Sequence, residues 1–115
     1  MTRDWTQGGE GIAYQACPRC GAVWYFARSF CPGCGAAPET RAARGEGRVQ
    51  AATLVTRAPS PELRALAPYA ILLVEMEEGF RMMAHGERDL RIGDRVRARF
   101  PRFAGRVVPH FERAP

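Results

Sequence analysis

The sequence contains no lysine, so all 17 of its basic residues are arginines. It also lacks a long apolar run, since the longest, at residues 69–74, is far too short to span a bilayer. The first residues, MTRDWTQGGEG, have no apolar segment that resembles a signal peptide. These absences argue against membrane insertion and secretion, and we expect a cytoplasmic protein without a membrane partner.

Cysteine is scarce as well, and the four that are present fall within one short stretch, CPRCGAVWYFARSFCPGC. They form two Cys-Pro-x-Cys-Gly motifs, whose cysteines are Cys17, Cys20, Cys31 and Cys34. In a reducing compartment, paired Cys-x-x-Cys motifs indicate a metal site more often than disulfides. The spacing therefore predicts that these four thiolates bind one metal ion.

Zinc is the metal that this motif favours, because it prefers four soft ligands in a tetrahedron. All four ligands come from the protein and no position remains for substrate, so we expect a structural Zn²⁺ site. Iron, as in rubredoxin, is the alternative. Gly21 and Gly35 are expected to turn the backbone so that N–H groups point at sulfur. A unit of about 20 residues buries too little apolar surface to fold alone, so the metal is expected to supply its folding free energy.

Positive charge is concentrated in the C-terminal third of the chain. Residues 81–113 contain nine arginines and four acidic residues, whereas the rest of the chain has equal numbers of both. A basic surface attracts phosphate-bearing partners, either nucleic acid or nucleotide-like cofactors.

The cysteine motifs, followed by several strand-like stretches, predict a mainly β protein: a rubredoxin-like zinc ribbon followed by a five-stranded OB-fold barrel. Residues 1–13 read as a loose arm with an exposed Trp5, residues 14–38 as the ribbon and residues 45–115 as the OB-fold domain. Alternating or apolar patterns predict strands at 48–56, 69–77, 80–85, 95–100 and 106–111. The proline-rich excursion at 58–68 includes one expected helical turn, at 62–66.

Four arginines are candidates for binding phosphate groups. With a period of two, Arg95, Arg97 and Arg99 share one face of a strand, and Arg81 is placed to extend it. Guanidinium groups bind phosphate through paired hydrogen bonds. The alternative is a solvated strand face with no ligand.

Catalytic groups are not evident in the sequence. There is no Ser-His-Asp order, no phosphate-binding glycine loop and no open metal position, and His85 has no nucleophile or carboxylate at a meaningful spacing. The aromatic residues between the motifs are expected to pack around the metal hairpin or to meet a partner chain: Trp24, Tyr25, Phe26 and Phe30. We therefore expect no enzymatic activity from this chain alone.

These features together resemble a known family. The cysteine motifs precede Gly45-x-Gly-x-Val49, Thr56-Arg-Ala-Pro59, Pro68-Tyr69, the 75–79 stretch and Ile92-Gly93-Asp94-x-Val96. This order is similar to that of the zinc-ribbon/OB-fold acyl-CoA-associated proteins, long catalogued as a domain of unknown function. The resemblance covers residues 14–111. One departure is that only 16 residues precede Cys17, where family members usually carry a longer helical segment.

The resemblance implies a function that the residues alone do not. It implies a non-catalytic subunit in a hetero-oligomer with a thiolase-like or aldolase protein, which assists acyl-CoA binding and stabilises that partner. A single-stranded nucleic-acid-binding module is the alternative that the barrel and its basic face suggest. Nucleic acid is the less favoured partner, because the arginine strand has no exposed aromatic residues between its arginines.

Overall fold

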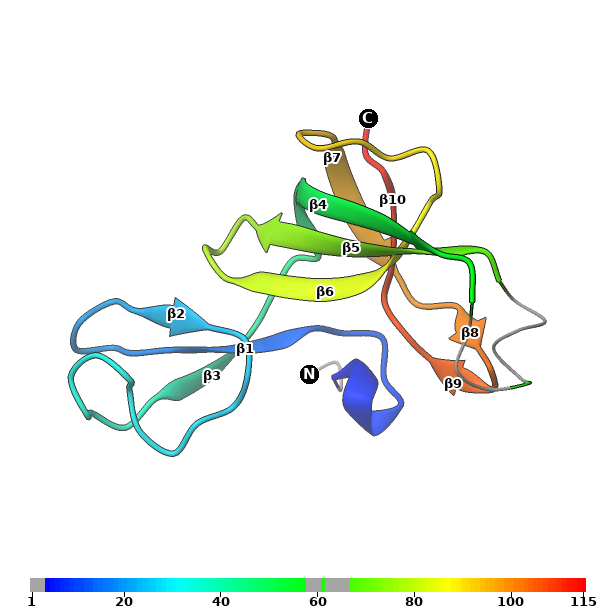
Figure 1. Cartoon of the computed structure of the whole chain (residues 1–115). Coiled ribbons are helices and arrows are strands. Elements are labelled where there is room, and N and C mark those ends of the chain that lie inside the picture. Colours follow the sequence, from blue (N-terminus) through cyan, green and yellow to red (C-terminus); the bar gives the residue numbers. More distant parts are fainter. Residues whose placement is uncertain (1–3, 58–60, 62–66) are drawn as a thin grey trace.

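The computed structural model describes residues 4–57, 61 and 67–115, and it consists of a small three-stranded sheet beside a closed five-stranded barrel (Figure 1). The molecule is elongated, with principal dimensions of 45 × 28 × 25 Å. The predicted class, a mainly β chain with a ribbon followed by an OB-type barrel, is confirmed. No helix in the described part of the chain has the length and apolar character needed to cross a membrane.

The ribbon sheet contains β1 (Ala13–Ala16), β2 (Val23–Trp24) and β3 (Glu39–Ala42), in the order β2-β1-β3. Both neighbours of β1 are antiparallel to it. Tyr14 and Ala16 alternate inward along β1 and are buried. This sheet extends one residue before position 14 and four residues beyond position 38, the limits that the sequence suggested.

The barrel is closed in the order β10-β6-β5-β4-β7. Its strands are β4 (Glu46–Val55), β5 (Tyr69–Met76), β6 (Arg81–Gly86), β7 (Arg95–Arg99) and β10 (His110–Arg113). The first four lie where the alternating patterns predict them. Closure depends on β10, which pairs parallel with β6 and antiparallel with β7. The largest fully buried side chains come from these strands: Val49, Leu72, Val74, Met76, Val96 and Phe111.

The last predicted strand, 106–111, is confirmed only at its ends, because residues 106–107 and 110–111 belong to two different strands. The chain first forms a separate hairpin from β8 (Arg102–Phe103) and β9 (Arg106–Val107). Positive φ angles at Ala104 and Gly105 make the tight turn between them. Pro109 has no N–H to donate to a ladder, and the barrel strand begins only after it, at His110. The helical turn expected at 62–66 lies outside the described residues.

The N-terminal segment is also more ordered than expected. From Asp4 onward it folds against the ribbon, beginning with the 3-10 helix η1 (Trp5–Gln7). The Asp4 carboxylate accepts hydrogen bonds from the backbone N–H groups of Thr6 and Ala13. The Trp5 indole is half-buried and donates to the Tyr25 hydroxyl at 2.9 Å, and Ile12 is buried. The expectation of a loose arm with an exposed Trp5 is therefore wrong for the described residues.

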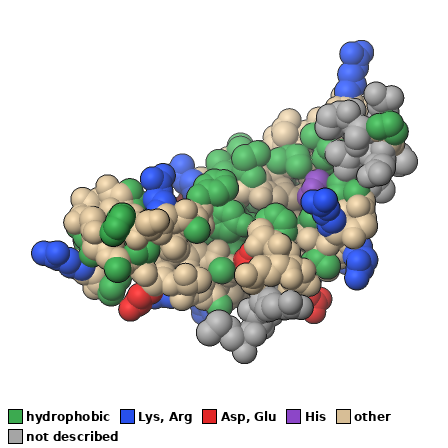
Figure 2. All heavy atoms as spheres, turned by 90° about the horizontal axis from the view of Figure 1, so that it is seen from below, with side chains coloured by type: hydrophobic (Ala, Val, Ile, Leu, Met, Phe, Trp, Pro, Cys, Tyr) green, Lys and Arg blue, Asp and Glu red, His purple; other side chains and the backbone are tan. Residues whose placement is uncertain are grey.

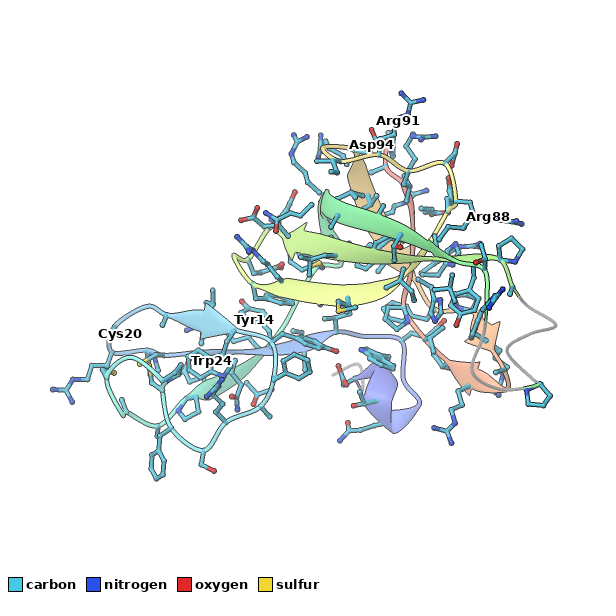
Figure 3. The ribbon with its side chains drawn as sticks, viewed as in Figure 1. Tyr14, Cys20, Trp24, Arg88, Arg91 and Asp94 are labelled. Carbon is cyan, nitrogen blue, oxygen red and sulfur yellow. The ribbon has the colours of Figure 1, made fainter. Side chains whose placement is uncertain are left out.

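An aromatic stack joins the two modules. Phe80, in the turn between β5 and β6, lies 4.7 Å from the Tyr14 ring and 5.9 Å from the Tyr25 ring, and both pairs are close to parallel. Figure 3 shows Tyr14 reaching from β1 toward the barrel. Arg44 strengthens the junction, because its backbone N–H and guanidinium donate to Glu78 and Glu77 respectively. The ribbon is thus packed against one end of the β5–β6 hairpin.

Removing the central ring of this stack should destabilise the whole molecule. We expect Phe80→Ala to lower the free energy of unfolding by about 3–5 kcal/mol, because the side chain is 2% exposed and its loss leaves a cavity. Urea unfolding followed by tryptophan fluorescence measures this. Phe26→Ala is the matched control: Phe26 is 79% exposed, and its loss should change stability by no more than about 0.5 kcal/mol. Equal losses from the two variants would contradict this account of the junction.

Candidate metal centre and basic strand face

The four cysteine sulfurs form one cluster at the end of the ribbon. All four Sγ atoms lie within 4.8 Å of one another, with Cys17–Cys34 at 3.5 Å and Cys20–Cys31 at 3.6 Å. A tetrahedral site with Zn–S bonds of about 2.3 Å places its sulfurs about 3.8 Å apart, so the cluster fits zinc. Disulfides need S–S contacts near 2 Å, and all four cysteines are free. The residues present therefore suit a closed tetrathiolate site.

The two cysteine motifs adopt the same local structure. In the first, Cys17 N–H donates to Ala22 O and Gly21 N–H donates to Cys17 O. In the second, Cys31 and Gly35 make the same two bonds, to Ala36 O and Cys31 O. The glycines have φ angles of 80° and 79°, which explains why glycine stands there. The glycines' own N–H groups bind carbonyls, and the N–H groups that point at sulfur belong to neighbouring residues.

Other backbone N–H groups do point at the buried sulfurs. Cys20 N–H donates to Cys17 Sγ and Gly33 N–H donates to Cys31 Sγ. The backbone N–H of Cys20 lowers the pKa of Cys17, and the backbone N–H of Cys34 contributes most to lowering the pKa of Cys31 to about 6. Both effects favour the thiolate, the form that binds a metal.

The aromatic residues between the motifs do not all cover the metal site. Trp24 donates through its indole N–H to the Gln15 side chain, and Tyr25 belongs to the junction stack. Phe26 and Phe30 instead face outward, with 79% and 67% of their surface exposed. The structure thus divides this set into one residue bonded within the ribbon, one stacked against the barrel and two that are exposed.

The strand face that the sequence predicted is present, but two of its three arginines share one carboxylate. Arg95, Arg97 and Arg99 are exposed along β7, while Val96 is buried. The Arg97 Nε donates to Glu112 at 2.9 Å, and Arg99 Nε lies 3.8 Å from the same carboxylate. Glu112 comes from β10, the strand that closes the barrel. Only Arg95 of the three has no ion pair with a described residue.

Arg48 is a basic neighbour that the sequence analysis missed. A row of exposed side chains crosses β7, β4, β5 and β6 in register: Arg95, Arg48, Glu75 and Arg81. In this row Arg48 lies directly beside Arg95. Arg81 lies on the far side of Glu75, so it does not extend the face formed by Arg97 and Arg99. Only the register of β4 against β7 reveals this neighbour, because Arg48 and Arg95 are 47 positions apart in the chain.

The two histidines lie together in a half-buried position. His85 on β6 pairs in register with His110 on β10, and the His85 ring is 4.2 Å from the Phe103 ring of the small hairpin. The His85 Nδ1 is buried without a hydrogen-bond partner among the described residues. Burial lowers the pKa of both histidines, and the nearby His110 adds to the effect on His85. These contacts describe two imidazoles packed together beside an aromatic ring, and their burial favours the neutral form.

The histidine pair should make stability depend on pH in a defined direction. Because folding lowers both pKa values, the unfolded chain takes up protons first, and stability should fall as the pH drops below about 6.5. Urea unfolding at about pH 7 and about pH 5 measures this change. In the His85→Gln/His110→Gln variant the fall over that range should be smaller. An unchanged pH dependence in the variant would show that other groups are responsible.

Metal binding can be tested with one ligand substitution. Cys20→Ser removes one sulfur and should abolish the binding of about one zinc ion per chain and lower the melting temperature, because the ribbon depends on the metal. Elemental analysis and thermal unfolding measure both effects. Arg19→Ala, an exposed neighbour in the same motif, is the control and should keep the metal. A red protein that contains iron would overturn the zinc assignment.

Comparison with protein families gives two matches that together cover most of the chain. The family model described as the rubredoxin-like zinc ribbon domain of ChsH2 matches residues 10–39, and the one for the C-terminal OB-fold domain of ChsH2 matches residues 40–101. The boundary between them falls at β3, where the chain leaves the ribbon for the barrel.

Two archaeal proteins are similar in sequence. Both are described as DUF35 domain-containing scaffold proteins: one from Methanocaldococcus jannaschii, 34% identical over 75% of this chain, and one from Methanothermobacter thermautotrophicus, 32% identical over 70%. The matched region spans 64% of each relative's length.

Two solved structures are similar in fold. A structure titled "Ltp2-ChsH2(DUF35) aldolase" contains a chain that matches with a TM-score of 0.77 and 25% identity, over 91% of this chain and 86% of that one. A DUF35 protein of unknown function from Sulfolobus solfataricus matches with a TM-score of 0.60 and 16% identity, over 90% of this chain and 76% of that one. The sequence and fold matches agree, and this chain belongs to the DUF35 family of ChsH2-like proteins.

Proposed function

We propose that this chain is a non-catalytic accessory subunit of a thiolase- or aldolase-type enzyme that acts on CoA thioesters. The observation that carries the proposal is the likeness of nearly the whole chain to a chain of the Ltp2-ChsH2(DUF35) aldolase. The name scaffold protein, given to both archaeal relatives, supports a role in assembly rather than in chemistry. In this proposal the ribbon holds a structural zinc ion and the barrel faces the thioester.

The surface of the chain supports binding to another protein. Phe26 and Phe30 are large, exposed aromatic side chains on the ribbon, and Arg28 lies between them in the sequence. Aromatic residues and arginine are enriched at protein interfaces. Figure 2 shows apolar side chains gathered over the middle of one face, between the ribbon end and the barrel end. A partner that covers this face would bury apolar surface from both modules.

The arginines of the barrel support a contribution to acyl-CoA binding. CoA carries phosphate groups, which guanidinium groups bind well. Within this proposal Arg95 is the strongest candidate of the four, because the Glu112 carboxylate already occupies Arg97 and Arg99. Arg81 is exposed and extends the same row of side chains. The acyl-CoA would be a ligand shared with the partner enzyme, in which the reaction takes place.

The nucleic-acid alternative has less support. OB-fold proteins that bind single strands present aromatic side chains on which bases stack. The outward side of β7 carries only arginines, and the exposed Phe26 and Phe30 belong to the ribbon. No described feature of the barrel favours this function over the accessory role.

Purification of the tagged chain from its native host tests the proposal. We expect a thiolase-like protein to co-purify at a fixed ratio. The purified complex should turn over a CoA thioester faster than the partner alone, and the chain alone should be inactive. Turnover by the chain alone, or purification without a thiolase-like protein, would contradict the proposal. The neighbouring reading frame gives an independent test, because genes of one complex are often adjacent.

A further inference from the structure

One end of the barrel contains a pocket that the sequence analysis did not predict. It lies where β4 and β7 begin and β5 ends, has a volume of about 300 Å³, and is lined in part by Arg48, Arg95, Glu75 and Glu77. This volume is at the lower end of the range for small-molecule pockets, about 300–1,000 Å³. It suits one small polar group rather than a whole cofactor.

The two arginines of the pocket are forced together by the strand pairing. Arg48 and Arg95 are directly opposite in the antiparallel ladder between β4 and β7, and both are exposed. Like charges in such positions repel each other. The Arg48 guanidinium donates to the Gly93 carbonyl, and neither arginine forms an ion pair with a described residue. Among the described residues, the pair therefore has no carboxylate in direct contact with either guanidinium group.

The acidic residues at the pocket form their bonds with other side chains, although Glu75 keeps its negative charge because its partner Gln50 is neutral. Gln50 Nε2 donates to Glu75 at 2.6 Å, and Arg44 Nη2 donates to Glu77 at 2.6 Å. Both bonds turn the carboxylates toward partners other than Arg48 and Arg95.

Three other arginines of the barrel strands have carboxylate partners, whereas Arg81 on β6 has no ion pair with a described residue. Arg97 and Arg99 share Glu112, and Arg113 reaches both Asp89 and Asp94. Arg48 and Arg95 differ from Arg81 in that they are direct neighbours in a ladder and line one pocket together, which suits them to bind an added anion.

We propose that Arg48 and Arg95 form a binding site for the phosphate or diphosphate group of a small molecule. Two guanidinium groups on neighbouring strands can each donate two hydrogen bonds, and together they match the charge and the oxygen acceptors of a diphosphate. Such a ligand also relieves the repulsion between the arginines. If the accessory role proposed above holds, the group is the phosphate end of the CoA thioester; that identification alone rests on the proposed function.

Titration of the isolated chain with inorganic pyrophosphate, followed by calorimetry, tests the site. We expect saturable binding that weakens as salt is added, and binding at least about tenfold weaker in Arg48→Gln/Arg95→Gln. Arg97→Gln/Arg99→Gln is the matched control, because it removes the same charge from the same face but leaves the pocket intact. It should change the affinity by less than about threefold. Urea unfolding checks that both variants fold.

Two results would overturn the proposal. Equal losses in the two variants would mean that pyrophosphate binds to general positive charge, and no saturable binding by the wild-type chain would mean that there is no site. A single-stranded oligonucleotide is the second probe: tighter binding of it than of pyrophosphate, lost in the same variant, would assign the arginines to nucleic acid instead.

A second measurement connects the site to the proposed complex. In the purified complex, Arg48→Gln/Arg95→Gln should raise the KM for the CoA thioester and leave kcat unchanged. This pattern is expected when a side chain binds the ground state and the transition state equally strongly. An unchanged KM, together with normal pyrophosphate binding by the wild-type chain, would keep the site and reject CoA as its ligand. Failure to find a thiolase-like partner would reject the proposed function and leave the pyrophosphate result standing.

Discussion

The ribbon has too little apolar surface to fold by itself, and this constraint shapes the rest of the molecule. Two interactions compensate, one at each end of the ribbon sheet. At one end four sulfurs are held at the spacing of a tetrahedral metal site. At the other end Tyr14 and Tyr25 stack on Phe80 of the barrel. The N-terminal segment then closes over the second end through the hydrogen bond from Trp5 to Tyr25.

The pairing of strands decides which charges remain available. The sequence suggests a uniform ladder of arginines along one strand, but each of them meets different neighbours. Arg97 and Arg99 approach Glu112 because β10 closes the barrel beside β7. Arg95 meets Arg48 because β4 lies on the other side. The same strand therefore carries two arginines that share a carboxylate and one that lies beside another arginine, and this difference arises from the pairing of the strands.

Short sequence patterns correctly predicted the elements whose structure depends on neighbouring residues in the chain. The alternation at β7, the apolar run at β5 and the repeated cysteine motifs each determine their own structure from a few neighbouring residues, and those predictions are confirmed. Features that depend on distant partners were missed. The ordering of Trp5 needs Tyr25, and the Arg48–Arg95 pair needs the register of two strands far apart in the chain. The final strand was misplaced because its β-branched residues at 107 and 108 hid the effect of Pro109.

The stacked junction also affects how the chain meets a partner. Because the Phe80 stack and the bonds from Arg44 fix the ribbon against the barrel, the 45 Å length of the molecule is one preorganised body instead of two tethered ones. A protein that contacts both modules then orders few additional degrees of freedom on association. The entropy cost of fixing the two modules is met during folding, so less of the binding free energy is lost when a partner associates.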